Sequence, residues 1–192
     1  MNINFSKGAW TTDELTYAYT YRFDDTNEFR QNEDSIENKE NPNCPADGYD
    51  YLSLVTTEKF PLGTKLSTRC SFSGKAAPLL IIADKLDLCG DGHMRYGNYL
   101  EVVVWKNGVN VWRLWRKEDG TVTWHKRLGM DFPVSENEIH TLSAELKEDY
   151  IVIELDGVKT TLRTEDLFHE FHLGITGCEG PCRFYAMTVE KV

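Results

Sequence analysis

The segment from Asn98 to Arg127 concentrates aromatic rings and polar side chains whose spacing could form a ligand site. Side chains alternate between the two faces of a strand, so residues two apart share a face. If Asn107 and Gly108 are the loop of a tight hairpin, one face collects mostly aliphatic side chains, as a core requires. The opposite face mixes rings with a carboxylate, an amide and a guanidinium: Tyr99, Glu101, Val103, Trp105, Asn110, Trp112, Leu114 and Arg116.

A second predicted hairpin, with Asp119 and Gly120 as its loop, extends both faces. On the core face, Trp115 and Trp124 would meet. Three residues would join the mixed face: Thr123, His125 and Arg127. A slip of one residue would reverse the faces of this strand, so the assignment depends on the register.

The mixed face suits a sugar. Glu101 and His125 would lie two strands apart, on the order of 10 Å, which leaves room for one sugar ring between them. Trp105 and Trp112 would stack on the apolar C–H face of a pyranose. Four side chains would hydrogen-bond its hydroxyls: Glu101, Asn110, Arg116 and His125. The alternative is that a further layer or a second subunit covers this face.

The elements that must position these residues are short strands. Residues 66–72 alternate in polarity, and residues 77–83 form a continuous apolar run, as in a strand buried on both faces. Asn-Gly and Asp-Gly pairs separate several strands. No long helical period appears, and only residues 164–168 suggest a short helical turn. This pattern predicts an all-β antiparallel sandwich or barrel.

Length and composition favour a single domain. The chain has 192 residues, which leaves little room for two domains. Residues 24–50 form a polar, acidic stretch that is too long for an ordinary connection, and we expect either a lid or a solvated insertion there.

Net charge and hydropathy limit the classes of ligand and the kinds of membrane association that we expect. The net charge is −10, which disfavours binding to phosphate backbones but not to neutral or cationic ligands. No apolar run approaches the roughly 20 residues of a membrane helix. The first residues lack a basic stretch leading into an apolar segment, which favours a cytoplasmic protein, although a mature secreted form would look the same.

Metal and cofactor signals are weak. The five cysteines suit reduced thiols better than a disulfide framework, and the Cys178–Cys182 spacing lacks further zinc ligands. Calcium at the acidic loop 84–93 is a minor alternative to a polar turn. His169 and His172 are three residues apart on a predicted strand, which does not suit a metalloprotease helix. We find no nucleotide-binding motif and expect no cofactor.

The segment Tyr96-Gly-Asn-Tyr-Leu-Glu-Val-Val-Val-Trp-Lys-Asn-Gly-Val-Asn-Val-Trp112 resembles the concanavalin A-like lectin and glucanase superfamily. Residues 137–142 and 152–157 suit the same pattern, and the resemblance covers roughly residues 50–192. It implies a two-sheet jelly roll with a concave ligand face. Members include lectins, glycosidases, lyases and noncatalytic modules, so the fold alone does not assign a function.

The sequence departs from the enzymes of that superfamily. Their paired acids, spaced Glu-x-Asp-x-Glu, are absent around Glu101, and the metal-binding pattern of legume lectins is not visible. A glycosidase needs two carboxyl groups, so Asp91 or Glu179 would have to supply the second from a loop. A lyase would use Tyr99 or His125 as its base, with Arg116 neutralising a uronate.

Three hypotheses follow. The first is a lectin-like protein that binds a monosaccharide or oligosaccharide without a cofactor. Its ligand-binding residues would be Tyr99, Trp105, Asn110, Trp112, Arg116, Arg127 and Glu179. The second is a glycan-active enzyme with Glu101 and His125 as catalytic residues. The third is an assembly protein, a homo-oligomer for instance, that buries its aromatic face against a partner chain.

Overall fold

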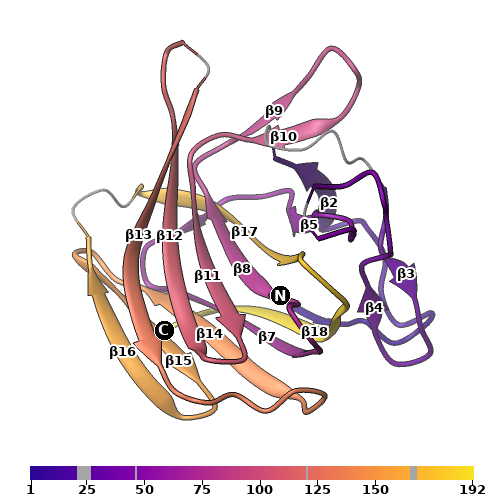
Figure 1. The fold of residues 1–192 in the computed structure, drawn as a ribbon. Coiled ribbons are helices and arrows are strands. Elements are labelled where there is room, and N and C mark those ends of the chain that lie inside the picture. Colours follow the sequence, from indigo (N-terminus) through magenta and orange to yellow (C-terminus); the bar gives the residue numbers. More distant parts are fainter. Residues whose placement is uncertain (21–26, 46, 120, 165–167) are drawn as a thin grey trace.

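The computed structural model describes residues 1–20, 27–45, 47–119, 121–164 and 168–192. Its strands form two sheets packed face to face, in which every strand pair is antiparallel except β2 (Leu15–Tyr19) with β10 (Met94–Tyr96). Figure 1 shows the two layers. The predicted all-β, two-sheet sandwich is therefore confirmed.

Sheet A has eight strands. In spatial order they are β16 (Val158–Arg163), β15 (Tyr150–Leu155), β14 (His140–Leu146), β7 (Thr64–Phe72), β18 (Cys182–Lys191), β4 (Ile36–Glu37) and β3 (Arg30–Gln31), with β1 (Asn2–Asn4) also paired to β18.

Sheet B has ten strands and carries both predicted hairpins at one end. In spatial order they are β13 (Val122–Asp131), β12 (Gly108–Arg116), β11 (Tyr99–Trp105), β8 (Leu79–Ala83), β17 (Glu170–Gly177), β5 (Leu52–Thr56), β2, β10 and β9 (Leu86–Leu88), with β6 (Phe60–Pro61) also paired to β17.

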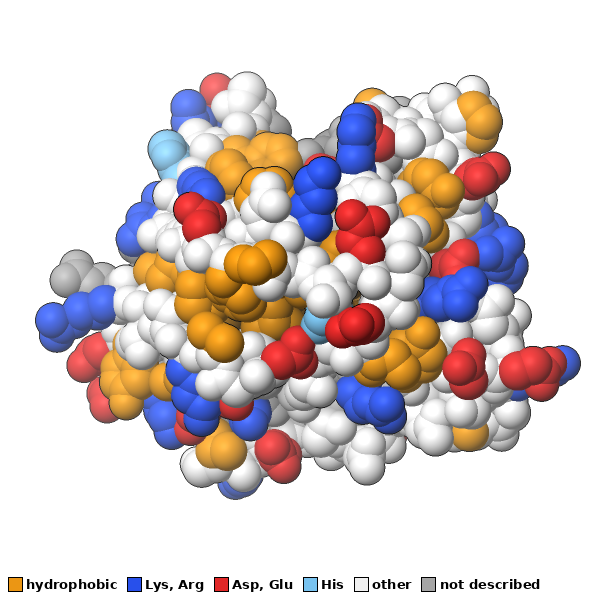
Figure 2. All heavy atoms as spheres, turned by 60° about the horizontal axis from the view of Figure 1, so that its bottom comes forward, with side chains coloured by type: hydrophobic (Ala, Val, Ile, Leu, Met, Phe, Trp, Pro, Cys, Tyr) orange, Lys and Arg blue, Asp and Glu red, His pale blue; other side chains and the backbone are white. Residues whose placement is uncertain are grey.

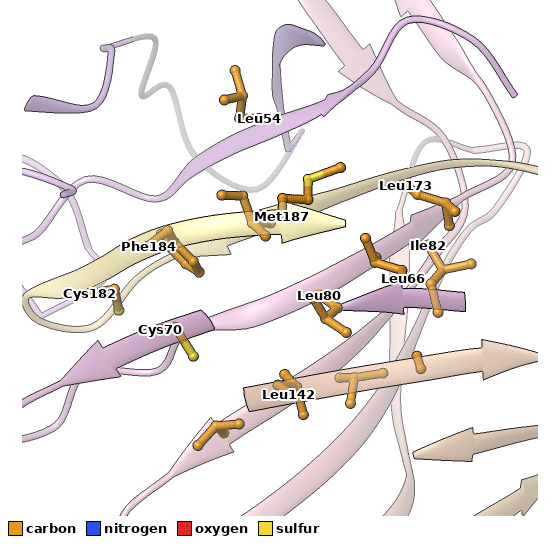
Figure 3. Packing of buried hydrophobic residues seen from close by; sticks show 14 of the residues in the cluster. Leu54, Leu66, Cys70, Leu80, Ile82, Leu142, Leu173, Cys182, Phe184 and Met187 are labelled. Carbon is orange, nitrogen blue, oxygen red and sulfur yellow. The ribbon is translucent and has the colours of Figure 1, made fainter. Parts of the chain in front are cut away.

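The main core lies between the two sheets. Leu80 and Ile82 of β8 pack there with Leu66, Leu142 and Met187 of sheet A, as Figure 3 shows. All five side chains are fully buried. Removing apolar surface of this kind from water is the main force that holds the sheets together.

Sheet B also buries much of its opposite face, which we call the distal face because it points away from sheet A. Leu79 and Ile81 belong to a second buried cluster on this face, together with Tyr96, Tyr99 and Leu114. The apolar run at residues 77–83 is buried throughout, and residues 79–83 of it form the predicted strand that is buried on both sides. Outside such clusters, Figure 2 shows acidic and basic side chains scattered among smaller hydrophobic patches.

The described part of the acidic segment 24–50 joins the edge of sheet A. Strands β3 and β4 extend the sheet beyond β18. The buried Glu37 carboxylate accepts hydrogen bonds from the guanidinium groups of Arg30 and Arg183. The fully buried Asn38 donates to the Gly180 carbonyl at 2.9 Å, which ties the segment to the loop before β18. Residues 24–26 and 46 lie outside the described residues.

The described residues also bear on the expected thiols, membrane segments, metal sites and helical turn. No disulfide links any of the five cysteines. The described ranges contain no helix long and apolar enough to cross a membrane, and no cluster of three or more potential metal ligands. Of the predicted helical turn at 164–168, residues 165–167 lie outside the described part of the chain.

Candidate functional site

A pocket of about 280 Å³ lies on the distal face of sheet B, at the end that carries the two hairpins. The residues that line it come from four neighbouring strands of the sheet, β8, β11, β12 and β13, and from flanking segments and loops. They are Tyr51, Lys75, Ala77, Leu79, Glu101, Val103, Trp105, Asn110, Trp112, Trp124, Cys178 and Glu179. We call this set the tryptophan pocket.

The first hairpin brings Glu101, Trp105 and Trp112 to one face, although its predicted register is wrong by two residues. Trp105 pairs with Gly108, and Glu101 pairs with Trp112 rather than with Leu114. The turn therefore consists of residues 106 and 107. Because side chains alternate with a period of two, a shift of two residues leaves every side chain on its predicted face.

Gly108 explains why the turn moves. It is not a turn residue but the first residue of β12, paired with Asp131 of β13. Its φ of 130° is rarely adopted by other residues, and a Cβ atom there would lie 1.9 Å from the Met130 carbonyl oxygen. The glycine therefore allows β13 to approach this position closely. An Asn-Gly pair interpreted as a two-residue loop does not indicate that role.

The predicted register of the second hairpin is wrong by one residue, which reverses the faces. Three residues separate Lys117 and Thr121, whose backbones are hydrogen-bonded at 2.8 Å, so the loop is one residue longer than predicted. Leu114 consequently pairs with Trp124, and His125 pairs with Arg113 on the face turned toward sheet A.

Two predicted ligand residues are therefore not in the pocket. His125 and Arg127 are exposed and do not line it. Arg127 falls at the irregularity where the pairing shifts between Val111 and Trp112. A bulge of this kind inserts an extra residue and restores the alternation beyond it. Trp124 takes the place that the prediction gave to His125.

Trp124 extends the aromatic wall of the pocket. Its ring centroid lies 5.4 Å from that of Trp112, with the planes at 64°. Trp124 retains 43% of its surface exposed, which is high for so large an apolar side chain. Trp115, its predicted partner on the core face, instead stacks on Phe168 with the centroids 5.3 Å apart. The pocket therefore has three tryptophans: Trp105, Trp112 and Trp124.

Two polar atoms of pocket residues are buried without a partner. Trp105 Nε1 and Asn110 Oδ1 make no hydrogen bond within the described part of the chain. The first is a donor and the second is an acceptor. Nearly all buried polar groups in folded proteins are hydrogen-bonded, so an unpaired donor and an unpaired acceptor beside one pocket mark it as a candidate ligand site.

Glu101 and Tyr51 line the pocket side by side and contact each other. The Glu101 side chain is almost fully buried, and its Oε1 accepts a hydrogen bond from the Tyr51 hydroxyl. Burial raises the pKa of Tyr51 well above its usual value, and the neighbouring Glu101 raises it further. Tyr51 therefore stays protonated and acts as a donor. No local sequence pattern indicates Tyr51, because it precedes β5, three strands away from β11 in the sheet.

Tyr99 and Arg116, which were predicted to bind the ligand, lie outside the pocket. Tyr99 shares the distal face with Glu101, but it is buried, and its hydroxyl is 3.2 Å from that of Thr20. Arg116 is exposed near the other end of β12, where its backbone N–H donates to Asn98 Oδ1 at 2.7 Å. Neither residue lines the tryptophan pocket.

Loops supply the charged rim. Glu179 is exposed and lines the pocket, as does Lys75, which pairs with Asp47 at 3.4 Å. The other loop acid considered from the sequence, Asp91, does not line the pocket. It pairs with Arg95 at 2.7 Å, and hydrogen bonds, first from the Arg95 side chain, lower its pKa to about 2. Glu101 and Glu179 are therefore the two carboxylates of the pocket.

Comparison with solved structures identifies proteins of similar architecture. The chain is 16% identical to the carbohydrate-binding module CBM66 from Bacillus subtilis, with a TM-score of 0.61 over 93% of this chain and 96% of that one. It is 10% identical to a glycoside hydrolase family 16 endo-glucanase from Bacteroides ovatus, with a TM-score of 0.66 over 99% of each chain. For β-agarase A from Zobellia galactanivorans, the TM-score is 0.70 at 10% identity, over 99% of this chain and 89% of that one.

These similarities show that the chain has the concanavalin A-like jelly-roll fold, as the resemblance in the sequence implied. The sequence matches no family model and no curated protein. The structural neighbours include both a noncatalytic binding module and glycoside hydrolases, so the fold is shared by the two kinds of protein.

Proposed function

We propose that this protein binds a neutral glycan in the tryptophan pocket. The observation that carries the proposal is the combination, around one cavity, of three indole rings with an unpaired donor, Trp105 Nε1, and an unpaired acceptor, Asn110 Oδ1. A sugar offers the complementary surface, because each ring has apolar C–H faces and hydroxyl groups that both donate and accept hydrogen bonds.

The charge of the site selects among glycans. Glu101 and Glu179 contribute two carboxylates to the pocket, and the whole chain carries a net charge of −10. Lys75 is a pocket cation, and it is already paired with Asp47. Anionic sugars would thus meet a repulsive field, whereas neutral sugars would not. The structural neighbours include a carbohydrate-binding module and a β-agarase in complex with oligoagarose, which supports a carbohydrate ligand.

The size of the pocket fits a small ligand. At about 280 Å³, it lies just below the roughly 300–1,000 Å³ usual for small-molecule sites. The proposed contacts with the glycan do not involve a metal ion. We therefore expect a chelator such as EDTA to leave binding unchanged.

The experiment is a screen of neutral glycans on an array, followed by titration of the best binder against the protein in solution. Trp112→Ala removes the central ring and should weaken binding by tenfold or more, about 1.4 kcal/mol. Trp115→Ala is the matched control, because it removes an indole from the same strand but from the opposite face. A flat response across the array, or equal losses in both variants, would count against the proposal.

A second candidate function is glycoside hydrolysis, and one observation favours it: Glu101 and Glu179 line the same pocket. Hydrolysis needs a pair of carboxyl groups on either side of the scissile bond. Glu101→Gln and Glu179→Gln should each abolish turnover of a bound oligosaccharide while preserving its binding. Absence of released sugar from the wild-type protein at saturating oligosaccharide would leave binding as the function.

A further inference from the structure

The distal face of sheet B is closed beyond the tryptophan pocket. One row of side chains crosses this face at the level of the pocket, strand by strand from β12 to β2: Asn110, Val103, Leu79, Thr176, Ser53 and Ala18. The first three line the pocket. The last three are fully buried, so along this row the cavity ends at β8. One row further on, the cavity extends past Ala77 to Cys178 and Tyr51, which are each 3% exposed.

The adjacent row behaves in the same way. Trp112 and Glu101 line the pocket, but the next residues across the sheet, Ile81 and then Val55 on β5, have no exposed surface. Along these two rows, no open groove crosses the described part of this face between β8 and β2.

Tyr51 forms the wall. It precedes β5, and its hydroxyl reaches Glu101 on β11, although β17 and β8 lie between those strands. Three strand spacings amount to about 14 Å, so the two side chains together must extend across the intervening strands. Both are almost fully buried, at 3% exposure for Tyr51 and 2% for Glu101.

Two more tyrosines fill the face behind this wall. The Tyr96 hydroxyl lies 3.2 Å from that of Ser53, and the Tyr96 ring packs edge-to-face on Tyr99 with the centroids 4.5 Å apart. Ser53 is in turn 2.6 Å from the hydroxyl of Thr176. These contacts satisfy the polar atoms of the closed region internally, in contrast to the unpaired atoms of Trp105 and Asn110.

The open side of the pocket lies toward the hairpins and the rim loops. Trp124 on β13 is 43% exposed, and the Lys75 side chain is 76% exposed. A ligand can therefore enter from this side, whereas Tyr51 and the buried rows block the way across the sheet.

From this geometry we infer that the tryptophan pocket recognises the terminal residues of a neutral glycan chain, or a free monosaccharide or disaccharide, and not the interior of a polysaccharide. The inference rests on the proposed function and specifies its ligand. An internal stretch of polymer must enter and leave its site, whereas a pocket with one opening accepts only an end.

The test measures affinity against chain length. The probes are linear gluco-, manno-, galacto- and fructo-oligosaccharides of two to eight residues, each with its linear polymer at two chain lengths. We expect any series that binds to give dissociation constants equal within about threefold from the disaccharide upward. At equal mass, the shorter polymer should bind more protein, in proportion to its number of ends.

Two outcomes separate this inference from the proposed function. Affinity that rises tenfold or more with chain length, or several protein molecules bound along one linear polymer, would overturn end recognition and leave glycan binding intact. Failure of every probe to bind would overturn the proposed function, and the inference with it.

Variants of the wall give a second readout. Tyr51→Ala should open the face and let longer oligosaccharides gain affinity over the disaccharide. Tyr51→Phe is the matched control, because it keeps the ring that closes the face. Whatever its affinity for the disaccharide, that affinity should stay the same for longer oligosaccharides. If Tyr51→Ala does not fold, the chain-length series on the wild-type protein still decides the question.

Discussion

The hydrogen bond between Tyr51 and Glu101 predicts a measurable stability effect. Tyr51→Phe removes only the hydroxyl, so it creates almost no cavity, and it leaves the buried Glu101 side chain without a donor that it uses in the native protein. The loss should therefore report the strength of one buried hydrogen bond.

The magnitude follows from the charge of the acceptor. A hydrogen bond to an ionised group contributes about 1.5–3 kcal/mol, whereas one between neutral groups contributes about 0.5–1.5 kcal/mol. If the Glu101 carboxylate is ionised, Tyr51→Phe should lower the free energy of unfolding by about 1.5–3 kcal/mol. For a domain of this size, the melting temperature should fall by about 3–12 °C.

The assay is urea unfolding at 25 °C, monitored by circular dichroism, on four proteins: wild type, Tyr51→Phe, Glu101→Gln and the double variant. Glutamine keeps an acceptor oxygen but no charge, so Tyr51→Phe should cost only about 0.5–1.5 kcal/mol in that background. The difference between the two costs is the part of the interaction that depends on the charge.

Two results would refute this reasoning. A change below about 0.5 kcal/mol for Tyr51→Phe would mean that the hydroxyl does not stabilise Glu101. Equal costs in both backgrounds would mean that the acceptor is not a carboxylate anion. A changed m-value would instead indicate altered exposure of surface on unfolding.

Three further predictions concern the register, the pH dependence and the thiols. His125→Ala and Arg127→Ala should change glycan affinity less than about twofold, and a tenfold loss in either would contradict the observed register of β13. Burial lowers the pKa of His172, whose Nδ1 donates to the Thr56 carbonyl at 2.9 Å. The unfolded chain therefore binds this proton more readily, and the free energy of unfolding should fall as the pH drops below about 6.5. His172→Gln should reduce that dependence, and an unchanged pH profile in urea titrations would contradict it. Cys89 should react with a thiol reagent in the native protein while Cys182, whose pKa burial raises to about 12, should not, and rapid labelling of Cys182 would contradict its burial.

The sequence was sufficient for several of the long strands and for part of the site. The run at residues 77–83 indicated a strand buried on both faces because no polar residue interrupts it. The first hairpin placed Glu101, Trp105, Asn110 and Trp112 on one face because its error was an even number of residues. The alternation of side chains therefore predicts the correct face of the strand whenever the register error is an even number of residues.

The rest of the site depends on contacts between residues that lie far apart in the sequence. The loop after β12 is one residue longer than its Asp-Gly pair suggests, and this single residue exchanges His125 for Trp124 on the distal face. The position of Gly108 is set by the approach of β13, which is a tertiary contact. Tyr51 reaches the site across two strands, and no local pattern around it indicates this.

The most direct test of the glycan site is an NMR titration of the indole N–H groups with the best-binding neutral oligosaccharide from the array. The chain has five tryptophans, so five indole signals report on separate places. We predict that the signals of Trp105, Trp112 and Trp124 shift, with Trp105 moving downfield as its Nε1–H gains a partner, while Trp10 and Trp115 stay unchanged. Saturable binding that leaves all three pocket signals in place, or that moves Trp10 and Trp115 instead, would contradict the assignment of this pocket.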